Sequence, residues 1–84
     1  MVRDAVLSMF NNIDLFEYYT NSKIVFANTA HHIIEIKDDW SKRFDLSNLF
    51  PCSNNTHNKI HALYKNNKTG TQKLLLDILT RHKE

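Results

Sequence analysis

The sequence predicts a small α+β fold, and three of its features lead to that prediction. Residues 13–20 and 24–27 are rich in aromatic and β-branched side chains and flank the polar residues 21–23, as the strands of a β-hairpin flank their turn. From Asn28 onward the apolar spacing changes to that of a helix. With 84 residues, the chain has room for one domain with a small core.

The other segments are interpreted in chain order. Residues 1–11 predict a short N-terminal helix with an apolar side. Residues 28–50 predict short helices, and the side chain of Asn28 is placed to cap the first of them. Residues 56–70 predict a longer connecting helix that stops before the single glycine, Gly70.

Several of these segments resemble the PAS domain, the sensory module of bacterial signalling proteins. Residues 16–18, Phe-Glu-Tyr, and residues 24–28, Ile-Val-Phe-Ala-Asn, are similar to its first two strands. Residues 45–51 and the Thr-Gly pair at 69–70 are similar to later segments of that family. The resemblance implies one PAS-like domain over 1–84, built as an antiparallel sheet with flanking helices. Of the five strands usual in the family, the last two are missing from this chain.

The C-terminal segment, residues 72–84, fits either a third strand or a helix. Leu74, Leu76 and Ile78 alternate as they would in a strand. An apolar helix stripe fits equally well and would comprise Leu74, Leu75, Ile78, Leu79 and His82. Intrinsic propensity favours the helix, because the run has few β-branched residues. The resemblance favours the strand, and a strand without its neighbours would expose an edge that another chain can pair with.

Charge and cysteine content limit the compartment and the partners. Eleven basic and nine acidic side chains give a net charge of +2, which is too small to argue for nucleic acid by itself. A single cysteine, Cys52, suits a reducing compartment. No signal peptide and no apolar stretch of membrane-spanning length is present, so we expect a cytoplasmic protein without membrane insertion.

The PAS resemblance implies a sensory, signal-transduction module. Such a module binds a small ligand or a partner and relays the change to an output domain, for example a diguanylate cyclase or a histidine kinase, through dimerisation. The chain itself is expected not to be an enzyme, because one glycine excludes a phosphate-binding loop and no Ser/His/Asp spacing selects a triad.

Two sets of residues follow from this interpretation. The ligand pocket is predicted to comprise the side chains between sheet and helices, namely Phe16, Tyr18, Val25, Ala27, His31, Ile34, Leu49, Phe50, Ile60 and Tyr64. The homodimer contact is predicted to use the apolar side of the N-terminal helix and one face of the first strand, namely Val6, Met9, Phe10, Leu15 and Tyr19. In the pocket, His31 is interpreted either as a hydrogen-bonded core residue or as a ligand contact.

Metal and cofactor binding have weak support in the sequence. Cys52, His57 and His61 have metal-compatible spacing, but a closed zinc site needs a fourth ligand, so surface polarity is the preferred explanation and no metal is expected. Haem-binding PAS proteins use a histidine of the connecting helix, and neither of these histidines is in register with it. Flavin-binding relatives carry a cysteine in a different motif, so the sequence requires neither haem nor flavin.

A second interpretation is a small, mostly helical interaction or nucleic-acid-binding protein. Residues 46–84 carry six basic and two acidic side chains, whereas residues 1–45 carry five and seven. In this interpretation the phosphate contacts would be Lys59, Lys65, Lys68, Lys73 and Arg81. These residues form no continuous basic run, so a solvated face explains them better, and nucleic acid is not the expected partner.

Overall fold

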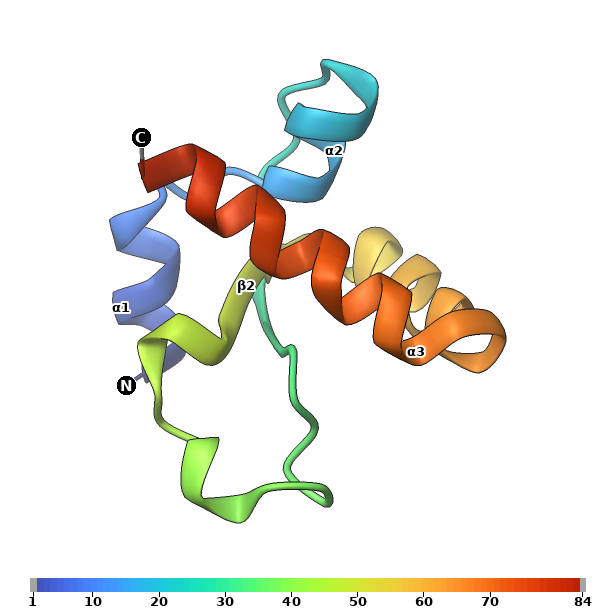
Figure 1. Cartoon of the computed structure of the whole chain (residues 1–84). Coiled ribbons are helices and arrows are strands. Elements are labelled where there is room, and N and C mark those ends of the chain that lie inside the picture. Colours follow the sequence, from blue (N-terminus) through green and yellow to red (C-terminus); the bar gives the residue numbers. More distant parts are fainter. Residues whose placement is uncertain (1, 84) are drawn as a thin grey trace.

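Helices pack on both sides of a short β-hairpin in the computed structural model, which describes residues 2–83 (Figure 1). The elements are α1 (Val2–Met9), α2 (Leu15–Asn21), β1 (Thr29–His32), the 3₁₀ turns Trp40–Lys42 and Leu46–Asn48, β2 (Leu49–Cys52) and α3 (Asn54–Lys83). The α+β class predicted from the sequence is therefore confirmed at this coarse level, with different elements from those of a PAS domain.

The sheet consists of β1 and β2 alone in the described part of the chain. The strands are antiparallel, with Thr29 opposite Cys52 and His32 opposite Leu49. Because side chains alternate along a strand, neighbouring residues of β1 face opposite ways, and His31 is buried while His32 is half-buried. The long loop 33–48 between the strands extends away from the helices in Figure 1.

α3 consists of two arms that meet at a break. Asn67 has an extended backbone, with φ −156° and ψ 83°, so the helical arms cover residues 54–66 and 68–83. The first arm begins at Ser53, whose hydroxyl accepts a hydrogen bond from the Thr56 backbone N–H at 3.2 Å. From the break, the second arm runs back across the molecule past β2 towards the end of α1 (Figure 1).

One apolar core joins the three helices and β2, and Ala30 of β1 packs against it. Its buried side chains include Val6, Phe10, Leu15, Phe16, Ile33, Leu49, Phe50, Ile60, Leu75, Ile78 and Leu79. None of the helices in the range 2–83 has the length and apolar character needed to cross a membrane.

The predicted hairpin over 13–27 is wrong. Residues 15–21 form α2, and only an isolated bridge between Ile13 and Phe26 resembles strand pairing. The reason is Asp14, whose buried carboxylate accepts hydrogen bonds from the backbone N–H of Glu17 at 3.0 Å and of Ser53 at 2.9 Å. This N-cap stabilises the helix against the β propensity of its aromatic residues.

The predictions for the rest of the chain also need correction. Residues 28–36 contain β1 instead of a helix, so Asn28 caps nothing and its side-chain oxygen accepts a hydrogen bond from the Thr29 hydroxyl at 3.0 Å. Residues 72–83 continue α3, as their intrinsic propensity favours, because Leu75, Ile78 and Leu79 of one helix face are buried in the core. The third strand implied by the PAS resemblance is therefore wrong.

Candidate functional site

Three histidines converge where β1 meets the first arm of α3. His31 comes from β1, while His57 and His61 lie one turn apart on α3, and one ring nitrogen of each lies within 4.8 Å of the others. The Nε2 atoms of His57 and His61 are 3.1 Å apart. Two nitrogens that bind one tetrahedral ion at 2.0–2.1 Å are separated by about 3.3 Å, so this pair already has the spacing that a metal requires.

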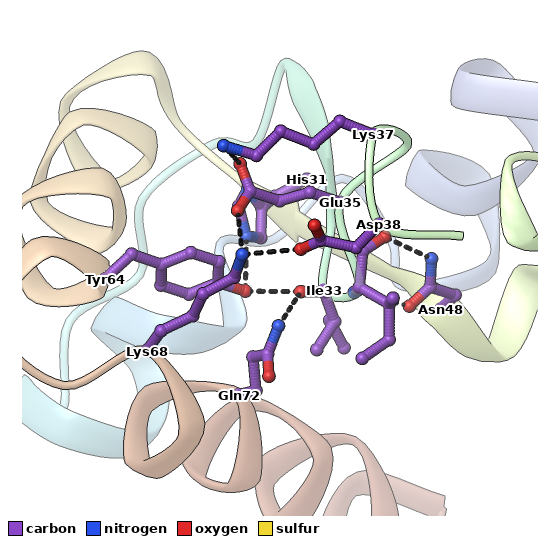
Figure 2. Close-up of polar contacts among 10 residues, drawn as sticks. His31, Ile33, Glu35, Lys37, Asp38, Asn48, Tyr64, Lys68 and Gln72 are labelled. Carbon is purple, nitrogen blue, oxygen red and sulfur yellow. Dashed lines mark hydrogen bonds and ion pairs between the residues drawn. The ribbon is translucent and has the colours of Figure 1, made fainter. Parts of the chain in front are cut away.

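Hydrogen bonds around His31 determine which of its ring nitrogens is free. The Tyr64 hydroxyl donates to the Ile33 carbonyl oxygen at 2.7 Å, so its oxygen must accept from His31 Nε2, which lies 3.0 Å away. The Nε2 atom therefore carries the hydrogen, and the lone pair is on Nδ1. Figure 2 shows this chain of contacts, in which Gln72 Nε2 also donates to the Ile33 carbonyl at 3.0 Å.

The environment favours the neutral form of two of these imidazoles, His31 and His57. Burial, followed by the neighbouring charges of His57 and His61, lowers the pKa of His31 to about 3. Burial and then His61 also lower the pKa of His57. Because only a neutral imidazole can bind a metal, these lowered pKa values favour the ligating state of His31 and His57 at neutral pH.

A fourth histidine, His32, lies beside the cluster but has a different hydrogen bond. Its Nε2 is 2.9 Å from the backbone carbonyl oxygen of Arg43, which can only accept, so Nε2 carries the hydrogen. The remaining lone pair is on Nδ1, where it can accept a proton. All four histidines line one open cavity of about 320 Å³, together with Glu35, Ile36 and Lys37.

Polar contacts hold the loop 33–48 next to this cavity. The Asn48 side chain accepts from the Ile34 backbone N–H at 2.7 Å and donates to the Ile34 carbonyl at 3.0 Å, which closes the base of the loop. Lys68 of α3 pairs with both Glu35 and Asp38 (Figure 2), and these hydrogen bonds raise the pKa of Lys68 and lower the pKa of both carboxyls. The second arm of α3 is thus tied to the loop that carries the rim of the site.

The residues predicted to line a ligand pocket do not surround one cavity. Five lie in the apolar core, namely Phe16, Leu49, Phe50, Ile60 and Tyr64. Ala27 is buried outside that cluster, Val25 and Ile34 are half-buried, and Tyr18 is exposed. His31 alone among the ten belongs to the histidine cluster. Binding of a small ligand by this set of residues stays an untested prediction.

The predicted dimer contacts and metal ligands are also distributed differently. Val6, Phe10 and Leu15 are buried in the chain's own core and so cannot face a partner, whereas Met9 is exposed and Tyr19 is half-buried.

His57 and His61 lie side by side, as their i, i+4 spacing requires. Cys52, the third member of that predicted set, is buried in β2 outside the cluster, and burial raises its pKa to about 12.

Sequence reasoning missed His32 and Asn48 as functional residues. The pair His31-His32 carried a usable signal, because neighbouring residues of a strand face opposite sides and can take different roles. That signal is lost once the segment is interpreted as a helix. Asn48 had no signal of its own, since its partners lie across the loop.

The fold and the site together define a class, namely small α+β proteins in which a β-hairpin and the following helix hold a histidine cluster beside an open cavity. The crystal structure of the HNH endonuclease of the deep-sea thermophilic bacteriophage GVE2, determined with manganese ion, matches this chain with a TM-score of 0.68. The two sequences are 34% identical, and the match covers 77% of this chain and 70% of that chain. The chain therefore belongs to the HNH endonuclease family. No protein-family model and no curated protein matches the sequence.

This membership corrects the functional expectations from the sequence. The match to an endonuclease overturns the identification as a PAS sensory module, together with its signalling function and its diguanylate cyclase or histidine kinase output domains. It also contradicts the expectations that the chain is not an enzyme and that nucleic acid is not its partner. The resemblance misled because short aromatic motifs occur in unrelated folds, and residues 16–18 here belong to a helix.

Proposed function

We propose that this protein is a metal-dependent endonuclease that hydrolyses phosphodiester bonds of nucleic acid. His31, His57 and His61 are its metal ligands, and His32 is its general base. The observation that supports this proposal most strongly is the convergence of three imidazoles at the same cavity as a fourth imidazole that has a different hydrogen-bond partner. The relative from phage GVE2, determined with manganese, supports the choice of reaction.

The chemistry of the donor set fits a divalent transition-metal ion. Imidazole nitrogen suits zinc, nickel, iron and related ions, and three protein ligands leave positions for substrate. When bound, the ion would act as a Lewis acid that stabilises negative charge on the phosphate. Tyr64 supports this role from outside the ligand set, because its hydroxyl holds His31 in the tautomer with a free Nδ1.

The protein's own proton chemistry centres on His32. In hydrolysis, the attacking water loses a proton as its oxygen bonds to phosphorus, and Nδ1 of His32 is the lone pair placed to accept that proton. The bond between phosphorus and the leaving sugar oxygen breaks, and that oxygen takes a proton from solvent water. The Arg43 carbonyl, 2.9 Å from Nε2, fixes the ring and stabilises the imidazolium that forms. Lys37 lines the cavity with an exposed ammonium group that attracts the phosphate backbone.

Cleavage of supercoiled plasmid tests the proposal. The metal-stripped protein is incubated with plasmid in buffers that contain Mn²⁺, Ni²⁺, Zn²⁺, Mg²⁺ or EDTA, and nicked and linear products are quantified on gels. We expect metal-dependent nicking that His57→Ala abolishes. His82→Ala is the matched control, because His82 is an exposed histidine near the end of α3 that hydrogen-bonds Tyr19 Oη at 3.0 Å, outside the cluster.

Two results would overturn this function. If the pure wild-type protein cleaves neither plasmid nor single-stranded DNA or RNA with any of the metals, it is not an endonuclease. If His57→Ala and His82→Ala cleave equally well, the activity comes from elsewhere. Circular dichroism on both variants confirms that they are folded before either conclusion is drawn.

A further inference from the structure

Two large aromatic side chains protrude from the loop 33–48. Trp40 is 63% exposed and Phe44 is 64% exposed, although rings of this size usually lie buried. The guanidinium of Arg43 lies against both rings, with its central carbon 4.2 Å from the Trp40 ring centroid and 4.9 Å from that of Phe44. We call Trp40, Arg43 and Phe44 the aromatic platform.

The aromatic platform borders a groove that reaches the proposed general base. The groove has a volume of about 770 Å³ and a mostly apolar lining, which includes the three platform residues, Ala30 and His32. A volume of this size accommodates flat organic groups. The platform and the base are also joined by a hydrogen bond, because the carbonyl that orients His32 belongs to Arg43 itself.

The guanidinium of Arg43 gives the platform one group that suits an anionic partner. Within residues 2–83, the Arg43 side chain donates one hydrogen bond, to the Trp40 carbonyl at 2.9 Å, and several of its five N–H donors have no partner in that range. The nearby carboxylates Asp39 and Asp45 instead cap the two 3₁₀ turns of the loop, where each accepts a backbone N–H at 3.0 Å. Phosphate that approaches the loop can therefore bind the free donors of the guanidinium.

From these observations, and resting on the proposed endonuclease function, we infer that the aromatic platform stacks unpaired nucleobases of the substrate strand beside the scissile phosphate. The occupant is a base rather than a purely apolar group, because flat rings and a planar cation suit the face of a base, and the neighbouring site suits its phosphate. A paired base offers no free face in a duplex, so the preferred substrate is single-stranded or locally unpaired nucleic acid.

The single tryptophan makes this inference directly measurable. Trp40 is the only tryptophan of the chain, so its fluorescence reports on the platform alone. The metal-stripped wild-type protein is titrated in EDTA with a single-stranded DNA 12-mer, and affinity is followed in parallel by anisotropy of a labelled copy. We expect saturable quenching of Trp40, and an affinity that falls roughly 5- to 150-fold for Trp40→Ala and for Phe44→Ala.

Matched controls separate stacking from charge. Phe26→Ala removes another exposed phenylalanine, 78% exposed and outside the groove, and should leave affinity unchanged. Arg43→Lys retains the charge and the backbone carbonyl but removes the planar cation, and should weaken binding. An abasic 12-mer retains every phosphate and should bind without quenching Trp40.

The outcomes distinguish the inference from the function it rests on. Base stacking is overturned if the abasic strand quenches Trp40 as strongly as the normal strand does. It is also overturned if Trp40→Ala and Phe26→Ala bind the DNA with equal affinity, and both conclusions hold even where plasmid cleavage succeeds. Quenching that depends on protein concentration without DNA would assign the platform to a second copy of the chain and also overturn it. Base-dependent quenching in EDTA without cleavage in any metal would support the platform and reject the endonuclease.

Discussion

Replacement of Tyr64 by phenylalanine tests the proposed metal centre without removing a ligand. The change deletes one hydroxyl group, which both accepts from His31 Nε2 and donates to the Ile33 carbonyl. The carbonyl keeps a donor, because Gln72 Nε2 also reaches it at 3.0 Å. The buried N–H of His31, a residue only 3% exposed, is left without its partner.

The expected magnitude follows from that loss. An orphaned buried donor costs about 1–3 kcal/mol of free energy of unfolding in the metal-free protein. Loss of the group that orients a ligand weakens metal affinity by about 10- to 100-fold, or about 1.4–2.7 kcal/mol. Both effects have one cause, because His31 can then rotate or change tautomer and its Nδ1 lone pair is no longer held in place.

Calorimetric titration of the metal-stripped protein with Zn²⁺ and Mn²⁺ measures the affinity of each variant. Gln72→Leu is the matched control, because it removes the other donor to the same carbonyl and leaves the contact between His31 and Tyr64 intact. We expect its metal affinity to stay within about twofold of wild type. If Tyr64→Phe binds metal as tightly as wild type, or if both variants lose affinity equally, Tyr64 does not position a ligand and the reasoning is refuted.

Four further predictions follow from the same contacts. His32→Ala should slow plasmid cleavage by about 10²- to 10⁴-fold while calorimetric metal affinity stays unchanged; a parallel loss of affinity would make it a ligand instead of a base. Asn48→Ala should lower the free energy of unfolding in urea by about 1–3 kcal/mol, because it opens the base of the loop; an unchanged midpoint would contradict that role. The hydrogen bond from Lys59 lowers the pKa of Glu17, so its stabilisation is present above the unfolded pKa of about 4.3 and is lost as pH falls through the lower folded pKa. Glu17→Gln should therefore be less stable than wild type at pH 7 and approach it at pH 3 in thermal unfolding; a constant difference would refute the linkage. Cys52, with its pKa raised to about 12, should react with Ellman's reagent at pH 8 only after unfolding, and rapid reaction of the native protein would contradict its burial.

The parts of the structure that local patterns determine were predictable. The apolar spacing of residues 1–11 predicts a helix there, and α1 occupies residues 2–9. The i, i+4 spacing of His57 and His61 places both imidazoles on one helix face, and their Nε2 atoms are 3.1 Å apart. These features depend on contacts within one turn, so no knowledge of the fold was needed.

The parts that depend on contacts between distant segments were not predictable from these patterns. The N-cap of α2 draws strength from the bond between Asp14 and Ser53, which are 39 residues apart in sequence. The histidine cluster needs β1 to dock on α3, so His31 was assigned to a pocket and Cys52 was grouped with the wrong histidines. A histidine on a strand and two on a helix have no common period, and only the packing of the two elements brings them together.

The break in α3 explains how so small a protein holds this site together. Tyr64 and Gln72 are eight residues apart, which would separate them by about 12 Å along a continuous helix and prevent both from reaching one oxygen atom. The extended residue Asn67 lies between them and turns the second arm back, and both side chains then donate to the Ile33 carbonyl. Ile33 directly follows His31 and His32 of β1. Both arms of α3 are therefore hydrogen-bonded to the chain next to the proposed ligand and the proposed base. A two-stranded sheet of four residues per strand is only marginally stable alone, and this double attachment holds the end of β1 against α3.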